Sequence, residues 1–182
     1  MSDKKLSVFV TVGSTKFDEL ARAVLSPQVL DALSARGFTR LVFQCGNSEI
    51  GDVMPGSLVH KEWNWRDEKR RMDISVWKFK PELGKDFEQA DLVISHAGSG
   101  TILEVLRLPR PMIVVPNETL LDNHQVELAN ELDRLGHLFA STPSALAETI
   151  KTYDSTKLKK FPQFDGTRFR QIMDEEMGFV SS

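Results

Sequence analysis

The chain has 182 residues, of which 41% are hydrophobic, and its 23 basic and 26 acidic side chains give a net charge of −3. This length suits one α/β domain with a substantial buried core. The nearly balanced charge, with a pI of about 5.8, argues against a nucleic-acid partner. A single cysteine excludes an internal disulfide, and no apolar run reaches the roughly 20 residues of a membrane span. We therefore expect a soluble, cytoplasmic protein of a reducing compartment.

Apolar segments of strand type and helix type alternate along the chain. The segment 6–12 is a nearly continuous β-branched run, which is typical of a strand buried on both faces of a parallel sheet. Further strands are predicted over 40–45, 58–65, 74–79, 91–95 and 112–116. Helices are predicted over 17–36 with an interruption at Ser26-Pro27, over 82–89, over 102–108, from Asp122 or Asn123 to 135, and over 143–153. This alternation predicts the α/β fold class, with a doubly wound parallel sheet and helices on both faces.

Two segments do not follow the alternation. The mixed-sign stretch 66–71 lies between two predicted strands and is interpreted as a solvated loop rather than a binding patch. After residue 157 the sequence becomes polar, and a helix-like segment follows whose apolar residues recur at helical spacing: Phe169, Ile172, Met173 and Met177. We expect one domain over 1–153 and a C-terminal tail over 154–182.

Two nucleotide-binding signatures are absent. The turn after the first strand reads Gly13-Ser14-Thr15, without the G-x-G-x-x-G pattern of dinucleotide-binding proteins. The stretch 46–51 has the glycine spacing of a phosphate-binding loop, but Asp52 stands where that loop requires lysine. Hydride transfer and nucleoside-triphosphate hydrolysis are therefore disfavoured.

Two glycine turns remain at the predicted carboxyl ends of strands, where open α/β sheets bind ligands. The turn at Gly13-Ser14-Thr15 fits an anion site and a simple tight connection equally well. The longer turn favours an anion site, because backbone N–H groups and a helix N-terminus attract negative charge. Its candidate residues are His96, Gly98, Ser99, Gly100 and Thr101.

Polar side chains near these turns suit sugar hydroxyls. Glu104 follows Thr101 by three residues and could accept hydrogen bonds from a ribose, or it is simply an exposed glutamate favoured by the helix dipole. Asn123 and Gln125 both donate and accept hydrogen bonds, although the stretch 122–125 could equally serve to cap a helix.

The two histidines near these turns and the remaining polar residues give no catalytic or metal pattern. The sequence identifies no acidic partner that would make His96 or His124 a base, so both are interpreted as structural groups or hydrogen-bond donors. No spacing of His, Cys or acidic residues indicates a metal site.

Three segments in this order resemble one family: 8–15, 90–101 with Glu104, and 123–129. The family is that of the soluble catalytic subunits of the UDP-N-acetylglucosamine transferase of asparagine-linked glycosylation, which carry the glycosyltransferase family 28 C-terminal domain. The similarity covers roughly residues 6–150. More distantly, the chain resembles the C-terminal half of the bacterial transferase (MurG) that adds N-acetylglucosamine to lipid-linked muramyl-pentapeptide.

The resemblance implies a single Rossmann-like domain, equivalent to the C-terminal, donor-binding half of a GT-B glycosyltransferase. It implies inverting, β1,4 transfer of N-acetylglucosamine from UDP-N-acetylglucosamine to N-acetylglucosaminyl-diphosphodolichol, with no metal and no further cofactor. Gly13, Ser14 and the turn 98–101 would then face the diphosphate, and Thr15 and His96 would also belong to the donor-binding residues. Glu104 would hold the ribose, Asn123 and Gln125 the sugar, and the segment 76–83 around Phe79 the uracil.

The same resemblance implies that the chain is active only with a partner. A GT-B active site lies between two Rossmann-like domains, so a membrane-anchored, acceptor-binding subunit at the cytosolic face of the endoplasmic reticulum would supply the second domain and the general base. The tail 154–182 is the segment expected to dock on that subunit, although its apolar stripe could equally pack on its own domain. A non-catalytic nucleotide-sugar-binding module and a flavodoxin-like flavin protein are the alternative functions.

Overall fold

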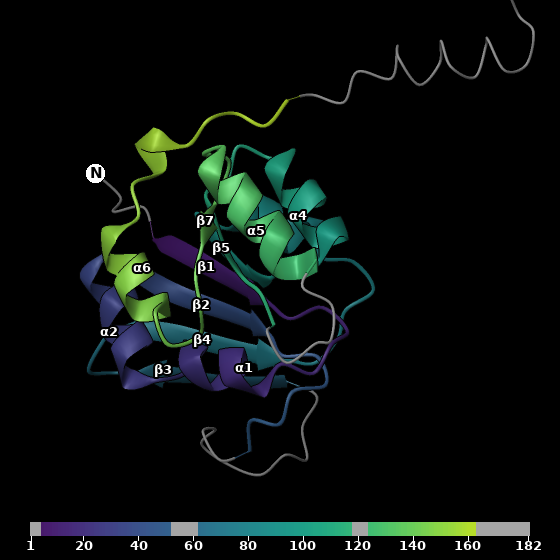
Figure 1. Cartoon of the computed structure of the whole chain (residues 1–182). Helices are drawn as coiled ribbons and strands as arrows, with labels where there is room; N and C mark the ends of the chain where they lie inside the picture. The colour runs from purple at the N-terminus through teal and green to yellow at the C-terminus, as the bar shows by residue number, and fades with distance from the viewer. Residues whose placement is uncertain (1–4, 52–61, 118–123, 163–182) are drawn as a thin grey trace, which may run out of the picture.

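The computed structural model describes residues 5–51, 62–117 and 124–162, and Figure 1 shows their arrangement. The strands are β1 (Leu6–Thr11), β2 (Phe38–Gln44), β3 (Glu62–Asp67), β4 (Met72–Trp77), β5 (Leu92–His96), β6 (Met112–Val115) and β7 (Phe139–Ala140). The helices are α1 (Asp18–Val24), α2 (Pro27–Ala35), α3 (Gly84–Gln89), α4 (Ser99–Leu106), α5 (His124–Arg134), α6 (Leu146–Thr152) and the 3-10 helix Ser155–Lys157. Strands and helices alternate, as predicted.

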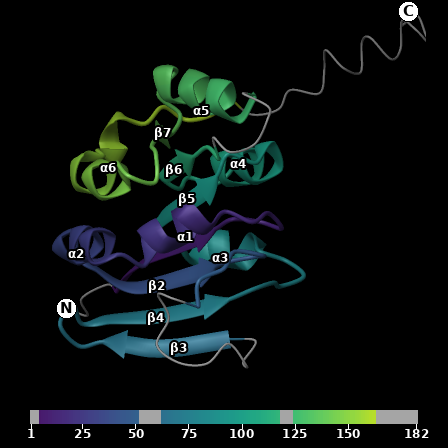
Figure 2. The same ribbon diagram turned by 60° about the horizontal axis from the view of Figure 1, so that its bottom comes forward.

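All seven strands form one sheet in the order β3-β4-β2-β1-β5-β6-β7. Every neighbouring pair is parallel except β3 and β4, which form an antiparallel hairpin at one edge, as Figure 2 shows. The predicted doubly wound α/β fold is confirmed, with one difference. Strand β3 departs from the parallel pattern, because only four residues separate it from β4 and a parallel crossover needs many more.

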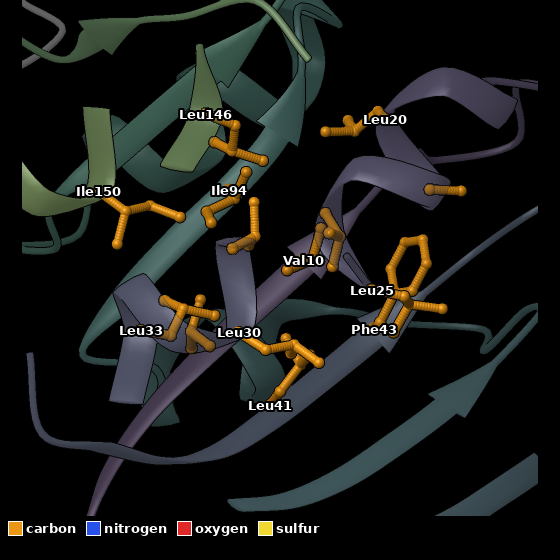
Figure 3. Packing of buried hydrophobic residues seen from close by; sticks show 14 of the residues in the cluster. Val10, Leu20, Leu25, Leu30, Leu33, Leu41, Phe43, Ile94, Leu146 and Ile150 are labelled. Carbon is orange, nitrogen blue, oxygen red and sulfur yellow. The ribbon is translucent and has the colours of Figure 1, made fainter. Parts of the chain in front are cut away.

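Helices cover both faces of the sheet, and each face has its own apolar core. On one face α1, α2 and α6 pack against inward side chains of the central strands, of which Figure 3 labels Val10, Leu41, Phe43 and Ile94. On the other face α3, α4 and α5 pack around Phe9, whose ring lies edge-on to that of Phe87 at 5.3 Å. The central strands are thus buried on both sides, which explains their continuous apolarity.

Local signals explain the helix boundaries. The predicted interruption at Ser26-Pro27 separates α1 from α2: the Ser26 hydroxyl accepts a hydrogen bond from the Val29 N–H, and Pro27 is the first helical residue. No helix within the described ranges is long and apolar enough to cross a membrane.

The interpretation of 66–71 as a solvated loop was wrong in part. Arg66 and Asp67 belong to β3, and the side chain of Arg70 is only 11% exposed. Its guanidinium donates hydrogen bonds to the carboxylates of Asp67 and Asp31, at 2.6 and 2.8 Å. These bonds join the hairpin turn to α2, so the charges stabilise a tertiary contact. The strand expected from residue 58 is described only from Glu62, and the apolar stripe over 169–177 lies outside the described residues.

Candidate functional site

The strands β1, β2, β4, β5 and β6 run parallel, so their carboxyl ends lie together at one end of the sheet. The loops that follow them carry most of the residues that the sequence singled out. Ligands of open α/β sheets bind at this end. The geometry of the loops therefore decides what could bind here.

The two glycine turns meet at the imidazole of His96. A Cβ atom on Gly13 would lie 2.8 Å from His96 Cε1, and one on Gly98 would lie 2.4 Å from His96 Nε2. Both distances are shorter than van der Waals contact allows, so only glycine lets the two backbones approach the ring this closely. Gly13 also has a φ of +62°, a conformation that other residues rarely adopt. The two turns, 85 residues apart in the sequence, thus pack against one imidazole ring, and we call the turns and the ring together the glycine-turn surface.

His96 is buried within this surface. Its side chain is 8% exposed, and its Nδ1 makes no hydrogen bond with any described residue. Burial lowers the pKa of the imidazole, and the backbone of Thr11 offsets this only in part. Burial therefore favours the neutral form of the ring. The contacts with both glycine turns give His96 a structural part in their packing, and its role as a hydrogen-bond donor stays a prediction.

The N-terminus of α4 opens onto the same surface. Gly98 precedes the helix in an extended conformation, and no side chain of the described residues caps the helix N-terminus. Ser99 and Gly100 are exposed, and a Cβ on Gly100 would meet nothing within 4 Å. The first N–H groups of the helix, at the positive end of its dipole, therefore have no side-chain cap among the described residues, an arrangement suited to an anion.

Glu104 and the predicted uracil segment are neighbours. Glu104 is exposed on α4, and its Oε1 lies 3.7 Å from the position of a Cβ on Gly84, the first residue of α3. The preceding loop carries Phe79, whose side chain is 54% exposed. The carboxylate of Glu104 thus lies beside the start of α3, and the loop before α3 carries an exposed aromatic ring.

The remaining predicted residues have different surroundings. The Thr15 hydroxyl donates to the Val12 carbonyl at 2.6 Å and is committed to the turn, whereas the side chain of Ser14 is exposed. The side-chain oxygen of Gln125 accepts a hydrogen bond from the backbone N–H of Asn117 at 3.4 Å. Asn123 lies outside the described residues.

Gln44 is a site residue that the sequence analysis missed. It is 2% exposed at the end of β2, and its amide donates to the carbonyl oxygens of Gly13 at 2.8 Å and Lys78 at 2.5 Å. Its carbonyl oxygen accepts a hydrogen bond from the hydroxyl of Thr11. One side chain thereby fixes the first glycine turn relative to the loop of Phe79. The available signal was a lone amide after an apolar strand, which could have marked a buried polar network.

The described part of the chain contains no group of three or more His, Cys, Asp or Glu side chains that could hold a metal ion. Backbone N–H groups and the dipole of α4 contribute positive charge at this end of the sheet, and so do exposed lysines of its loops: Lys16, Lys78 and Lys80.

Comparisons with known proteins identify the family to which the chain belongs. Residues 7–175 match the model of the glycosyltransferase family 28 C-terminal domain. The relatives carry the name "UDP-N-acetylglucosamine transferase subunit ALG13". The relative from Cryptococcus neoformans is 36% identical, with 95% of this chain and 97% of the relative covered, and that from Saccharomyces cerevisiae is 32% identical, with 93% and 95% covered. The human relative is 42% identical over 74% of this chain. The chain spans only 11% of the length of the human relative and 11% of the length of the mouse relative.

Solved structures show the same fold. A solution NMR structure of ALG13 has a TM-score of 0.67 at 27% identity, covering 92% of this chain and 94% of that one. The crystal structure of Acinetobacter baumannii MurG, at 21% identity and a TM-score of 0.59, matches 87% of this chain with 44% of its own length, which supports the fold alone. The chain therefore belongs to the glycosyltransferase family 28 C-terminal domain family, together with the UDP-N-acetylglucosamine transferase subunits that it resembles.

Proposed function

We propose that the chain is the donor-binding, catalytic subunit of a UDP-N-acetylglucosamine-dependent glycosyltransferase. The observation that carries this proposal is the joining of two glycine turns at His96, beside the uncapped N-terminus of α4. A nucleotide sugar needs an anion site for its diphosphate, flanked by groups for its ribose and base. The relatives' names supply the nature of the donor.

The diphosphate binds along the turn 98–101 and the turn at Gly13-Ser14. Backbone N–H groups and about half a positive charge from the dipole of α4 stabilise it. The same groups act more strongly as UDP leaves, because negative charge then grows on the phosphate. In this proposal the helix terminus provides the charge that a metal supplies in other transferases, so no metal is required.

Side chains around this anion site orient the rest of the donor. Glu104 accepts hydrogen bonds from the ribose hydroxyls, and the segment 76–83 around Phe79 holds the uracil. The Oε1 of Glu104 lies 3.7 Å from the place where a Cβ on Gly84 would stand, so this carboxylate is next to the residue that follows the segment 76–83. This proximity supports the pairing, since ribose and base are adjacent in the donor. Asn123 and Gln125 contact the hydroxyls of the transferred sugar.

The acceptor and the general base belong to a second subunit. We propose that it is membrane-anchored at the cytosolic face of the endoplasmic reticulum and presents N-acetylglucosaminyl-diphosphodolichol to the donor. A base on that subunit would deprotonate the acceptor hydroxyl, which attacks the sugar from the face opposite UDP and forms a β1,4 bond with inversion. The word "subunit" in the relatives' names supports such an assembly.

The test is a transfer assay on the chain co-expressed with the membrane subunit, with Glu104→Ala as the variant. Each hydrogen bond to a charged group contributes about 1.5–3 kcal/mol, so the loss of two should lower kcat/KM for the donor by about 100-fold or more. Glu88→Ala, which removes an exposed glutamate from α3, is the matched control and should leave transfer unchanged.

Three results would contradict the proposal. Transfer that is insensitive to Glu104→Ala would refute the role of this residue. Full activity of the isolated chain would refute the need for a second subunit. Donor binding without transfer by any assembled complex would favour the non-catalytic nucleotide-sugar-binding module.

A further inference from the structure

The loop after β2, residues 45–51, has the glycine spacing of a phosphate-binding loop without the lysine that such a loop needs. We call it the β2 loop. It contains no cationic side chain that could meet a phosphate. Because β1 and β2 are parallel neighbours, the β2 loop and the first glycine turn, Gly13-Ser14-Thr15, leave the same end of the sheet. The contacts between them are with the backbone of that turn.

Three successive carbonyl groups of the first glycine turn accept hydrogen bonds from β2 and its loop. The side-chain amide of Gln44 donates to the carbonyl of Gly13 at 2.8 Å, and that of Asn47 donates to the carbonyl of Ser14 at 2.8 Å. The backbone N–H of Asn47 donates to the carbonyl of Thr15 at 3.3 Å. All three carbonyl groups therefore point toward β2 and its loop.

Gly46 lets the β2 loop come this close to the turn. Its φ is +55°, and a Cβ on it would lie 2.6 Å from the carbonyl oxygen of Gly13 and 2.9 Å from that of Thr15. A side chain at this position would therefore displace the turn. One contact follows further along, where the N–H of Phe17 donates to the hydroxyl of Ser48 at 2.9 Å. The β2 loop thus accompanies the turn from Gly13 to the start of α1.

The fixed carbonyl groups decide where the N–H groups of the turn point. In a trans peptide unit the C=O of one residue and the N–H of the next point in opposite directions. The N–H of Ser14 follows the held carbonyl of Gly13 and therefore points away from β2. The N–H of Lys16 likewise follows the held carbonyl of Thr15. Among the described residues, neither of these two N–H groups has a hydrogen-bond partner.

The free N–H groups face the second glycine turn. In the sheet β1 lies between β2 and β5, so the side of the first turn that is turned away from the β2 loop is the side of the turn 98–101. Backbone N–H groups that converge in a turn bind anions. The diphosphate site of the proposed function therefore depends on how the β2 loop holds the first turn.

We propose that Asn47 is a positioning residue of the donor site. It bonds to two of the three held carbonyl groups, and the peptide unit that its side chain holds lies between the units that carry the N–H groups of Ser14 and Lys16. Asn47 acts on the donor through these backbone groups and does not touch it. The inference rests on the proposed function, because the diphosphate is the ligand that the oriented N–H groups bind.

Kinetics of the chain co-expressed with the membrane subunit test this role. Asn47→Leu removes the amide, preserves side-chain bulk and adds no charge. Oriented N–H groups matter most when negative charge grows on the leaving UDP, so kcat should fall about 10-fold while KM for the donor changes by about 2-fold at most. The midpoint of urea unfolding should stay unchanged, because Asn47 is exposed and water replaces its amide.

Two further variants frame this result. Asn47→Gln keeps an amide donor on the β2 loop and should restore most of the lost rate. Asn64→Leu makes the same substitution at an exposed position of β3, at the far edge of the sheet, and should leave kcat unchanged.

Amide NMR signals of the full chain give a second readout. Saturating UDP should shift the signals of Ser14 and Lys16 together with those of the turn 98–101. In Asn47→Leu the shifts at Ser14 and Lys16 should shrink, whereas those of the turn 98–101 should remain. A general loss of structure would reduce both sets.

Four outcomes would overturn the proposal. The first is a kcat that Asn47→Leu leaves unchanged or that Asn64→Leu lowers equally. The second is a lower unfolding midpoint with equal loss of the UDP shifts at both turns, which would show a structural role only. The third is a set of UDP shifts in the turn 98–101 without any at Ser14 and Lys16, which would leave the proposed function intact. The fourth, UDP that shifts no signal in either turn, would contradict the proposed function as well.

Discussion

Replacing Gln44 by leucine tests whether one buried amide holds the candidate site together. The substitution preserves side-chain bulk but removes three hydrogen bonds, from the amide to the carbonyls of Gly13 and Lys78 and from the hydroxyl of Thr11. Thr11 is fully buried, so water cannot replace its lost acceptor, whereas Gly13 and Lys78 are at least partly exposed and can be solvated. One unsatisfied buried group costs about 1–3 kcal/mol and a solvated one less, which gives a loss of about 2–4 kcal/mol.

The assay is urea unfolding of the full chain, read as the free energy of unfolding at constant m-value. Gln89→Leu removes an exposed amide from α3 and should change this free energy by less than about 0.5 kcal/mol. Thr11→Val removes the hydroxyl from the other side, and its effect should not add to that of Gln44→Leu, because the two share one hydrogen bond. A Gln44→Leu variant as stable as the Gln89→Leu control would refute the reasoning.

Two other substitutions test separate contacts. Gly98→Ala places a Cβ 2.4 Å from Nε2 of His96, so it should destabilise the protein by about 1–3 kcal/mol and abolish donor binding in a titration. Combining it with His96→Ala should recover stability. A single variant with unchanged stability would contradict the packing described. Arg70→Ala tests how stability depends on pH. The hydrogen bond from Arg70 lowers the pKa of Asp31 below its ordinary value of 3.8. The Arg70–Asp31 contact therefore stabilises the folded protein fully above pH 3.8, and this stabilisation is lost as the pH falls through the lowered pKa. The variant should therefore lose less stability than the parent between pH 5 and 2 in urea titrations, and parallel pH profiles would show that the contact contributes nothing.

Local sequence signals predicted the elements but not their pairing. The run 6–12, the glycine turns and Ser26-Pro27 each carry a short-range physical cause, and each is found where it was expected. The antiparallel direction of β3 was not predictable from its own residues, because alternation does not encode which way a neighbour runs. The strand β7 has two residues, too few for any periodicity.

The candidate site, too, was only partly predictable from the sequence. Its polar and glycine residues were identifiable because they follow apolar strands, but their contact was not. Gly13 and Gly98 meet at His96 only because β1 and β5 are neighbours in the sheet. Gln44 was missed because a single buried amide has no sequence spacing, and its partners are backbone atoms of distant loops.

The two edge strands of the sheet limit self-association. On one side the sheet ends at β3, whose outward positions alternate with its tryptophans and carry Glu62, Asn64 and Arg66. On the other side it ends at β7, which offers only two residues for pairing. An edge strand with charged side chains and an edge strand of two residues both resist the addition of a further strand. The sheet is therefore self-limiting, and concentrated chains are protected from stacking edge to edge into fibres while the helix-lined faces and the loops remain free for other contacts.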